Sequence, residues 1–408
     1  MSRWPLKTVG DICDVNPRLP RGHNIADDQI VSFVPMAAVD EVSGTIQALH
    51  TRPFAEVKKG YTHFMNGDVL FAKITPCMEN GKAAIASELV GGLGFGSTEF
   101  HVLRAKNGVL PEWLFYFVRQ PAFRNEAKRN FTGTAGQQRV PTTFLSSAVI
   151  PVPPLPEQRR IVDLLSRAEG IVRLRHEAEK KTAELIPALF LDMFGDPATN
   201  PKGWEVALLP NVLARPFKNG LYLPKERYAP EGTNLGVEMV HMSDAFYGEV
   251  KRGGLRRVFA EGKQVDDYNL TKTDLLVARR SLNFDGAAKL CGIPEHDQPL
   301  LFESSFIRLT PNLDRVRTEY LLHYLNNEHT RKAFVLSRIS GITISGINQA
   351  ALNSIPVMVP PCQIQDQFVG KVDQARAIET QQSAAAAKAH SAFDALLARA
   401  FSFDEVLQ

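Results

Sequence analysis

The chain contains one order of motifs twice, with the second copy about 205 residues after the first. The most visible pair is "PVPPLPEQRRIVDLL" from Pro151 and "PVMVPPCQIQDQFVG" from Pro356, each a proline-rich hinge followed by a Gln and an amphipathic run. A period of this length indicates a duplicated domain rather than a solenoid of short repeats. Three further pairs keep the same order: "GDVLFAKI" from Gly67 with "TDLLVARR" from Thr273, "TEFHVLRA" from Thr98 with "SSFIRLTP" from Ser304, and "TGTAGQQRV" from Thr132 with "SGITISGIN" from Ser340.

Composition places the chain among ordinary globular proteins of more than one domain. Its 408 residues exceed the usual size of one hydrophobic core, and 44% apolar with 22% charged residues argue against general disorder. The net charge is only +3, so a nucleic-acid surface would have to come from local clusters of Lys and Arg. Four scattered cysteines suit a reducing compartment, and neither a signal peptide nor a membrane span is visible. We therefore expect a cytoplasmic chain without membrane contact.

Each copy begins with a globular part. Runs such as "DVLFAKI" and "TEFHVLRA" have the β-branched and aromatic residues of strands, and "PEWLFYFVRQPAFRNEAKRN" predicts helices with a break at Pro121. Strands and helices together predict a mixed α/β (α+β) fold. We expect a globular domain at residues 1–155, a helix at 156–195, a second globular domain at 196–360 and a second helix at 361–408.

The segment after each globular part predicts a long helix. Between Glu157 and Phe194 the only glycine is Gly170 and the only proline is Pro187, and such a helix would be about 55 Å long. Apolar residues recur in heptads, which predicts two antiparallel coiled-coil helices, whereas ordinary surface helices on separate domains are the alternative. We place these residues at the helix–helix seam: Ile161, Leu164, Ala168, Ile171, Leu185, Leu189, Phe368, Val372, Ala375, Phe393 and Leu396.

At these residues the chain resembles the DNA-specificity subunit of a type I restriction–modification system. "IPVPPLPEQRRIVDLL" from Ile150 is similar to the hinge and helix of that family, "ALFLDMFGD" from Ala188 to its helix end, and "GDVLFAKI" to a strand block of its recognition domains. The resemblance extends over essentially the whole chain. The second hinge departs from the pattern, because it has Asp366-Gln367 in place of Glu157-Gln158.

The resemblance implies a fold and a set of partners. Subunits of this family carry two target-recognition domains joined by two long helices with pseudo-twofold symmetry. They bind double-stranded DNA and are not enzymes themselves. They assemble with two methyltransferase subunits, which bind S-adenosylmethionine, and with restriction (translocase) subunits that use ATP and Mg. No cofactor is then expected on this chain.

Two different reading domains on a stiff helical spacer predict a bipartite, asymmetric DNA site. A helix near 55 Å corresponds to about 16 base pairs at 3.4 Å each, so helix length would set the gap between the half-sites.

Base readout and phosphate binding need Arg, Lys, Asn, Gln, Ser or Thr side chains, and neighbouring glycines let the backbone approach phosphate. In the first globular part we expect DNA contacts from Lys73, Lys82, Thr132, Thr134, Gln137, Gln138 and Arg139. In the second we expect them from Lys251, Arg252, Arg256, Arg257, Arg279, Arg280, Asn283, Lys289, Ser340, Thr343 and Asn348.

No motif for catalysis is apparent. The chain lacks an Asn/Asp-Pro-Pro-Tyr/Phe methyltransferase motif and a Gly-rich nucleotide loop, and His323 and His329 fall on different faces of a helix. We therefore expect no catalytic residue and no metal site. Two other classes stay open: an enzyme that modifies DNA by itself through an unrecognised site, and a coiled-coil scaffold without a nucleic-acid role.

Overall fold

The structure is a computed structural model that describes residues 4–19, 24–134, 136–245, 248–250, 252–341 and 344–402. The chain forms two compact units. Unit 1 consists of Met1–Lys180 together with Gln381–Gln408, and unit 2 consists of Lys181–Thr380. Unit 1 is therefore assembled from two segments that are far apart in the sequence.

Unit 1 contains a four-stranded antiparallel sheet of order β2-β9-β6-β7. Its inner strand β6 (Val69–Ala72) is fully buried. Val69 and Phe71 enter one core cluster and Leu70 enters another, which explains why this strand is a continuous apolar run. A second sheet of order β4-β3-β8-β5 contains one parallel pair, β3 with β8, and β1 pairs with β10. The other strands are β1 (Leu6–Thr8), β2 (Cys13–Val15), β3 (Ile30–Val34), β4 (His50–Pro53), β5 (Thr62–Met65), β7 (Ala83–Ile85), β8 (Leu93–Gly96), β9 (Phe100–Ala105) and β10 (Val149–Pro151).

The main helix of this domain is α3 (Pro111–Arg119), in which every residue from Trp113 to Val118 is buried. The predicted break at Pro121 is confirmed, because α3 ends before Gln120 and α4 (Pro121–Arg129) begins with that proline. The remaining helices of unit 1 are α1 (Val9–Ile12), α2 (Phe54–Val57), α5 (Thr142–Ser147) and most of α6 (Leu155–Ala183).

Unit 2 repeats this order of strands. Its four-stranded sheet has the order β12-β19-β15-β17, and β15 (Leu275–Ala278) is again buried at every position. The sheet β14-β13-β18 again contains one parallel pair, β13 with β18, and β11 pairs with β21. The common topology confirms the predicted mixed α/β fold and its internal repeat. The other strands are β11 (Glu205–Leu208), β12 (Leu213–Asn219), β13 (Val237–Val240), β14 (Arg257–Val258), β16 (Arg280–Ser281), β17 (Leu290–Gly292), β18 (Leu300–Phe302), β19 (Phe306–Pro311), β20 (Ser345–Gly346) and β21 (Pro356–Val359).

The first long helical segment extends over residues 155–194 with one interruption, which divides it into α6 and α7 (Leu185–Phe194). Pro187 has no N–H to bond the carbonyl of Ala183, so the helical hydrogen bonding is interrupted at Glu184, whose backbone stays in the helical region. In contrast, α12 (Cys362–Ala400) contains no proline and is continuous. None of the described helices has the length and apolar content to span a membrane. The other helices of unit 2 are α8 (Gly262–Tyr268), α9 (Thr318–Asn326), α10 (Glu328–Thr330) and α11 (Gln349–Asn353).

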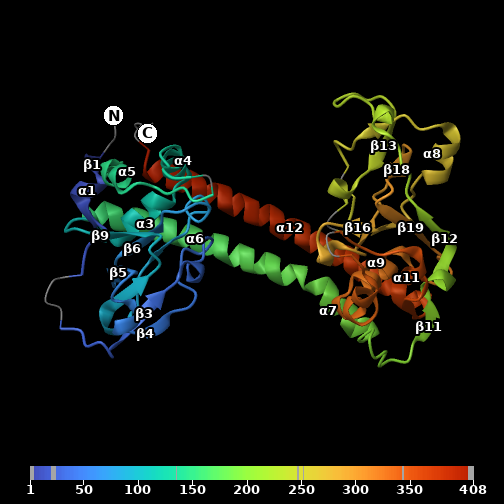
Figure 1. The fold of residues 1–408 in the computed structure, drawn as a ribbon, viewed down its shortest axis with the longest axis horizontal. Coiled ribbons are helices and arrows are strands. Elements are labelled where there is room, and N and C mark those ends of the chain that lie inside the picture. Colours follow the sequence, from blue (N-terminus) through green and yellow to red (C-terminus); the bar gives the residue numbers. More distant parts are fainter. Residues whose placement is uncertain are drawn as a thin grey trace. The chain divides into compact units, whose positions relative to one another are not determined.

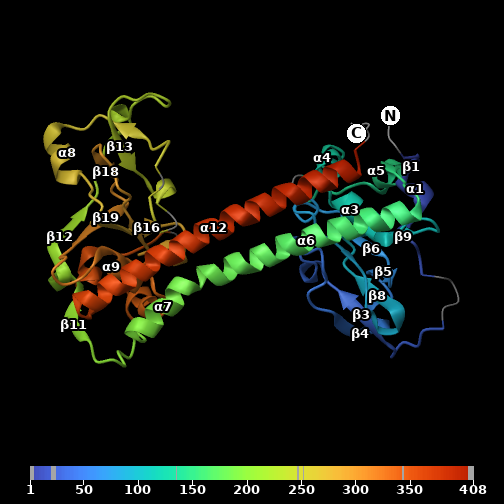
Figure 2. The same cartoon turned by 180° about the vertical axis from the view of Figure 1, so that it is seen from behind.

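In unit 1 the start of α6 and the end of α12 lie against α3 (Figures 1 and 2). Leu165 and Leu397 join Trp113 in one core cluster. The two helical segments are antiparallel, because farther along α6 the guanidinium of Arg175 donates to Gln382, which precedes Leu397 in α12, at 3.2 Å.

In unit 2, α7 and the start of α12 contact α9 through aromatic rings. The ring centroids of Phe194 and Tyr320 are 4.8 Å apart, and those of Phe190 and Phe368 are 5.7 Å apart. Offset and edge-to-face pairs of this kind add to the free energy gained by burial. The aromatic helix of each domain is thus held by segments of both long helices.

The residues expected at the helix–helix seam have unequal burial. Leu164, Ile171 and Leu185 are 45%, 53% and 43% exposed, whereas the neighbouring Leu165 is 1% exposed. Leu164 and Ile171 lie in α6, where Leu165 packs with Trp113 of the globular part, whereas Leu185 lies in α7. The other predicted seam residues are buried or half-buried: Ile161, Ala168, Leu189, Phe368, Val372, Ala375, Phe393 and Leu396.

The Gln of the first hinge, Gln158, is fully buried. Its side-chain oxygen accepts from the N–H of Leu110 at 2.9 Å, and its amide donates to the carbonyls of Gly108 and Pro153 at 2.9 and 2.7 Å. One side chain therefore satisfies three backbone groups where the domain meets the helix.

In the second hinge Gln365 makes the same three kinds of hydrogen bond as Gln158. The sequence-based pairing of Glu157-Gln158 with Asp366-Gln367 is therefore wrong, because Gln365 is the counterpart of Gln158. The buried Gln365 accepts from the N–H of Arg317 at 2.7 Å and donates to the carbonyls of Arg315 and Pro360 at 2.9 and 2.7 Å. Gln367 is exposed.

Candidate nucleic-acid interface

In unit 1 the buried strand β6 leads into a loop, residues 73–82, that pairs with a second loop, residues 132–139. Ile74 and Arg139 form an antiparallel bridge, and the N–H of Val140 donates to the carbonyl of Lys73 at 2.9 Å. Thr132 and Arg139 exchange two backbone hydrogen bonds of 3.0 and 2.9 Å, which closes the second loop. The fold thus brings together two predicted DNA-contacting segments that are about 60 residues apart in the sequence.

Unit 2 has the same arrangement. The strand β15 leads into β16, which pairs with β20, and the N–H of Ile347 donates to the carbonyl of Arg279 at 3.1 Å. Ser340 and Gly346 close the second loop with backbone hydrogen bonds of 2.9 and 2.8 Å. We call the described residues of 279–289 with those of 340–346, and the described residues of 73–82 with those of 132–139, the paired loops of their units.

Two cations of the paired loops in unit 1, Arg139 and Lys82, have carboxylate partners. Arg139 donates to both oxygens of Glu99 at 2.9 and 2.8 Å, and these hydrogen bonds hold the pKa of Glu99 below its usual value. Lys82 forms an ion pair with Glu41 at 3.3 Å. Lys73 and Gln138 are half-buried, whereas the polar residues Thr132, Thr134 and Gln137 are exposed.

His101 supports the paired loops of unit 1. It is 2% exposed, its Nε2 lies 2.8 Å from the carbonyl oxygen of Val140, and its Nδ1 lies 3.1 Å from Nδ2 of Asn16. Because a carbonyl only accepts, Nε2 carries the proton and Nδ1 accepts from the Asn16 amide. Burial lowers the pKa of His101 to about 4, so this ring is neutral at physiological pH.

The paired loops of unit 2 leave more charge exposed. Arg280 and Lys289 are exposed, and Arg279 is half-buried with a hydrogen bond to the carbonyl of Ser304 at 3.4 Å. Asn283 is exposed and caps a short helical turn by accepting from the N–H of Asp285 at 3.0 Å. Ser340 and Asn348 are also exposed, and Asn348 caps α11.

The cluster Arg252–Arg257 leads into another sheet, because Arg257 is the first residue of strand β14. Arg252 and Arg257 form ion pairs with Glu238 at 2.6 and 3.3 Å, which neutralises part of the cluster. Arg256 is exposed, with its guanidinium carbon 5.8 Å from the ring centroid of Tyr228. Lys251 and Thr343 lie outside the described residues.

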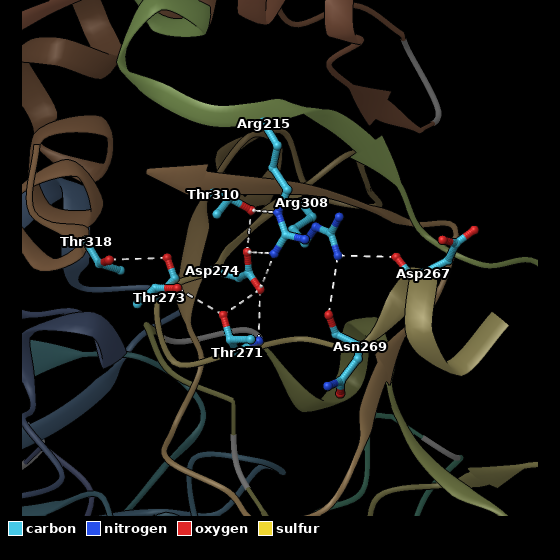
Figure 3. A network of polar contacts seen from close by, with 9 residues as sticks. All are labelled: Arg215, Asp267, Asn269, Thr271, Thr273, Asp274, Arg308, Thr310 and Thr318. Carbon is cyan, nitrogen blue, oxygen red and sulfur yellow. Dashed lines mark hydrogen bonds and ion pairs between the residues drawn. The ribbon is translucent and has the colours of Figure 1, made fainter. Parts of the chain in front are cut away.

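A polar network holds the entry to β15 (Figure 3). The buried carboxylate of Asp274 accepts from the N–H and Oγ1 of Thr271 at 2.8 and 2.9 Å and from the guanidinium of Arg215 at 3.3 Å. Thr310 donates to it as well. The network orients the strand that leads into the paired loops, and sequence reasoning missed it.

The same carboxylate recurs in unit 1 as Asp68. It accepts from the N–H of Met65 at 2.8 Å and from Arg104 at 2.9 and 2.7 Å. An Asp directly before each buried strand, in "GDVLFA" and "TDLLVA", is the sequence signal that could have revealed both sites. No group of three His, Cys, Asp or Glu side chains among the described residues could hold a metal ion.

Fold and site together define a class of protein: a tandem α/β chain that presents one pair of polar loops per unit beside long helices. A sequence model of the family described as "Type I restriction modification DNA specificity domain" matches residues 1–185 and 201–387. The chain belongs to this family.

Individual relatives match parts of the chain. The type I restriction enzyme EcoAI specificity subunit of Escherichia coli is 41% identical over 161 residues, which cover 39% of this chain and 27% of that protein. The StySPI specificity subunit of Salmonella potsdam is 24% identical over 329 residues, covering 73% and 66%. The chain thus covers only about a quarter of the EcoAI subunit's length.

Two solved structures share the fold. One, described as "Structural basis underlying complex assembly and conformational transition of the type I R-M system", has a chain with a TM-score of 0.62 and 23% identity, covering 98% of both chains. The S subunit of a type I restriction–modification system from M. genitalium has a TM-score of 0.53 and 14% identity, covering 99% of this chain and 97% of that one.

Proposed function

We propose that this chain is the sequence-specific DNA-recognition subunit of a type I restriction–modification complex, with one half-site read by each unit. The observation that carries the proposal is the recurrence of the paired loops at corresponding places of two units with one topology. The loops differ in sequence while the strands around them correspond. Equal scaffolds with different loops suit a bipartite, asymmetric DNA site.

Exposure and ion pairing divide the proposed contact residues into two groups. Exposed side chains supply direct contacts to base edges and phosphates, because they alone can reach a partner. Lys82, Arg139, Arg252 and Arg257, which have carboxylate partners, position the surface instead. The proposed direct contacts are Thr132, Thr134, Gln137, Arg256, Arg280, Asn283, Lys289, Ser340 and Asn348.

The chain acts in this proposal as a non-catalytic, cytoplasmic subunit. It binds double-stranded DNA and two methyltransferase subunits that carry S-adenosylmethionine, and restriction subunits with ATP and Mg join the same complex. Residues 1–155 and 196–360 serve as the two target-recognition domains, and residues 156–195 and 361–408 serve as the helical spacer and partner platform.

Binding of duplex DNA tests the proposal directly. The purified full chain is used to select duplexes from a random library, and the affinity for a selected duplex is measured between 50 and 200 mM salt. We expect a bipartite consensus and an affinity that falls by at least about tenfold over this range, because phosphate contacts release counterions. A chain that selects no consensus would be a scaffold without a DNA role.

Methyl transfer separates the proposal from a stand-alone enzyme. The full chain is incubated with the selected duplex and labelled S-adenosylmethionine, with and without the methyltransferase subunits. We expect label in the DNA only when those subunits are present. Label transferred by the chain alone would reject the non-catalytic assignment.

A further inference from the structure

The paired loops of unit 2 expose large apolar side chains. Leu282 is 87% exposed, more than any other large apolar residue among the described residues, and Ile344 and Phe284 are 52% and 46% exposed. In unit 1, the pairing of "GDVLFAKI" with "TDLLVARR" sets Pro76 at the position of Leu282 and the fully buried Met78 at the position of Phe284. None of the described residues in the paired loops of unit 1 is an exposed large apolar one. The apolar surface is therefore a feature of unit 2 and not of the common scaffold.

A short strand pair places Leu282 and Ile344 next to each other in the fold. Ser281 pairs with Ser345 between β16 and β20, and both are buried. Leu282 directly follows the end of β16, and Ile344 directly precedes the start of β20. Arg280 and Leu282 are exposed on either side of the buried Ser281, so the cation and the apolar side chain both reach solvent beside this pair.

Hydrogen bonds fix the loop that carries Leu282. The N–H of Asn283 donates to Oγ of Ser281 at 3.1 Å, and the side-chain oxygen of Asn283 accepts from the N–H of Asp285 at 3.0 Å. The buried Arg331 donates to the carbonyls of Asp285 and Ala287 at 3.1 and 3.0 Å. Leu282 is thus held at a preorganised tip, which lowers the entropic cost of inserting it into a partner.

The surroundings of the tip identify the partner's chemistry. Residues 279–289 contain three cations, Arg279, Arg280 and Lys289, against the single carboxylate of Asp285. Cations flanking an apolar tip complement a partner that has apolar layers between rows of anions. A stack of base pairs between two phosphate backbones is such a partner.

We infer that Leu282 is a wedge that enters the base stack of the half-site read by unit 2, with Phe284 and Ile344 covering the opened step and Arg280 on the adjacent phosphate. The inference rests on the proposed function. It adds that unit 2 unstacks a base step, so it selects deformable sequence as well as base edges. Unit 1, which has Pro76 in place of Leu282, reads its half-site without this wedge.

A fluorescent base analogue tests the wedge. Duplexes selected by the full chain are prepared with 2-aminopurine at single positions of each half-site, since this base brightens when it loses its stacking neighbours. We expect wild-type protein to brighten positions in one half-site only. We expect Leu282→Ala to abolish the brightening and to weaken binding on the order of tenfold, because the apolar contact is lost.

Two variants serve as controls. Leu282→Met keeps an apolar side chain of similar volume and is expected to retain both signals. Leu235→Ala removes a leucine that is 57% exposed in the same unit but outside the paired loops, and is expected to change neither. Because Leu282 is so exposed, its replacement leaves the stability of unit 2 intact.

The wedge would be overturned if Leu282→Ala raised the 2-aminopurine fluorescence as much as the wild type does. It would also be overturned if the wild type raised the fluorescence at no position. The proposed function survives either result as long as the wild type still binds selected duplexes with a steep salt dependence. Failure of the wild type to bind any duplex removes both.

Discussion

At the scale of single residues, the hinge glutamines Gln158 and Gln365 are the clearest functional pair in the chain. A primary amide offers one oxygen that accepts and two N–H groups that donate, and here three backbone partners use them in the same way in both units. A carboxylate could accept but could not donate. The amide therefore joins the domain to the start of its helix.

Replacing Gln158 or Gln365 by Ala is expected to lower the free energy of unfolding by about 2 kcal/mol or more, since each change leaves buried backbone groups unsatisfied. Chemical denaturation of the full chain measures this. Gln367→Ala is the matched control, because Gln367 is exposed two residues away, and we expect a change of less than about 0.5 kcal/mol. Equal effects of the control and the hinge variants would contradict the assignment.

His101 makes stability depend on pH. Its native pKa is about 4 and its ordinary value is 6.5, so below pH 6.5 the unfolded state binds a proton that the native state does not. Stability is therefore expected to fall by about 3 kcal/mol as the pH drops from 6.5 to 4. His101→Gln should flatten this part of the stability–pH curve, while His390→Gln, on an exposed side chain of the same unit, should not. An unchanged slope in His101→Gln would refute the role.

At the scale of elements, the two long helical segments differ in continuity. The first is divided at Glu184 because Pro187 cannot complete the helical hydrogen bonds, whereas α12 runs through 39 residues, or about 58 Å. If helix length sets the gap in the DNA site, α12 is the element that carries the spacing.

Inserting one heptad after Arg175 in α6 and one after Gln382 in α12 lengthens both partners while keeping their buried faces in phase. The added rise of about 10 Å is expected to widen the gap by about three base pairs and to leave both half-sites unchanged. Mapping of methylated adenines in cells that carry the variant and its methyltransferase partners measures the gap. Seven residues inserted after the exposed Asp297 should not alter it; an unaltered gap in the helix variant would exclude the ruler.

At the scale of the whole molecule, unit 1 is completed by residues from the far end of the chain. Phe401 packs against Trp113 with ring centroids 4.5 Å apart, and Phe393 and Leu397 belong to the same core cluster. The globular part of unit 1 is therefore folded partly on a helix that belongs to the other copy of the repeat.

Exchange of residues 1–155 for those of a relative is expected to change one half-site only, provided that the aromatic positions of α3 are retained. The physical reason is that the paired loops of each unit are held within that unit. Methylome mapping reads out both half-sites in one experiment, and exchange of residues 196–360 is the reciprocal control. A simultaneous change of both half-sites would show that the units do not read independently.

Local patterns in the sequence were enough to predict the duplication, the mixed α/β class, the hinges and the helical segments. These features follow from periodicity, from β-branched and aromatic runs, and from the placement of Gly and Pro, all of which act within a few residues along the chain. The break at Pro121 and the buried runs of β6 and β15 belong to this group.

Only the tertiary structure decided which residues meet across long distances in the chain. Arg139 is paired with Glu99, 40 residues away, and Gln365 rather than Gln367 takes the buried place in the second hinge. Leu165 rather than Leu164 is buried, because α6 packs on α3 as well as on α12. Folding brings together residues that are far apart in the sequence, and these neighbours determine which charges are neutralised, which side chains are buried and which helix face packs. Local sequence patterns do not contain that information.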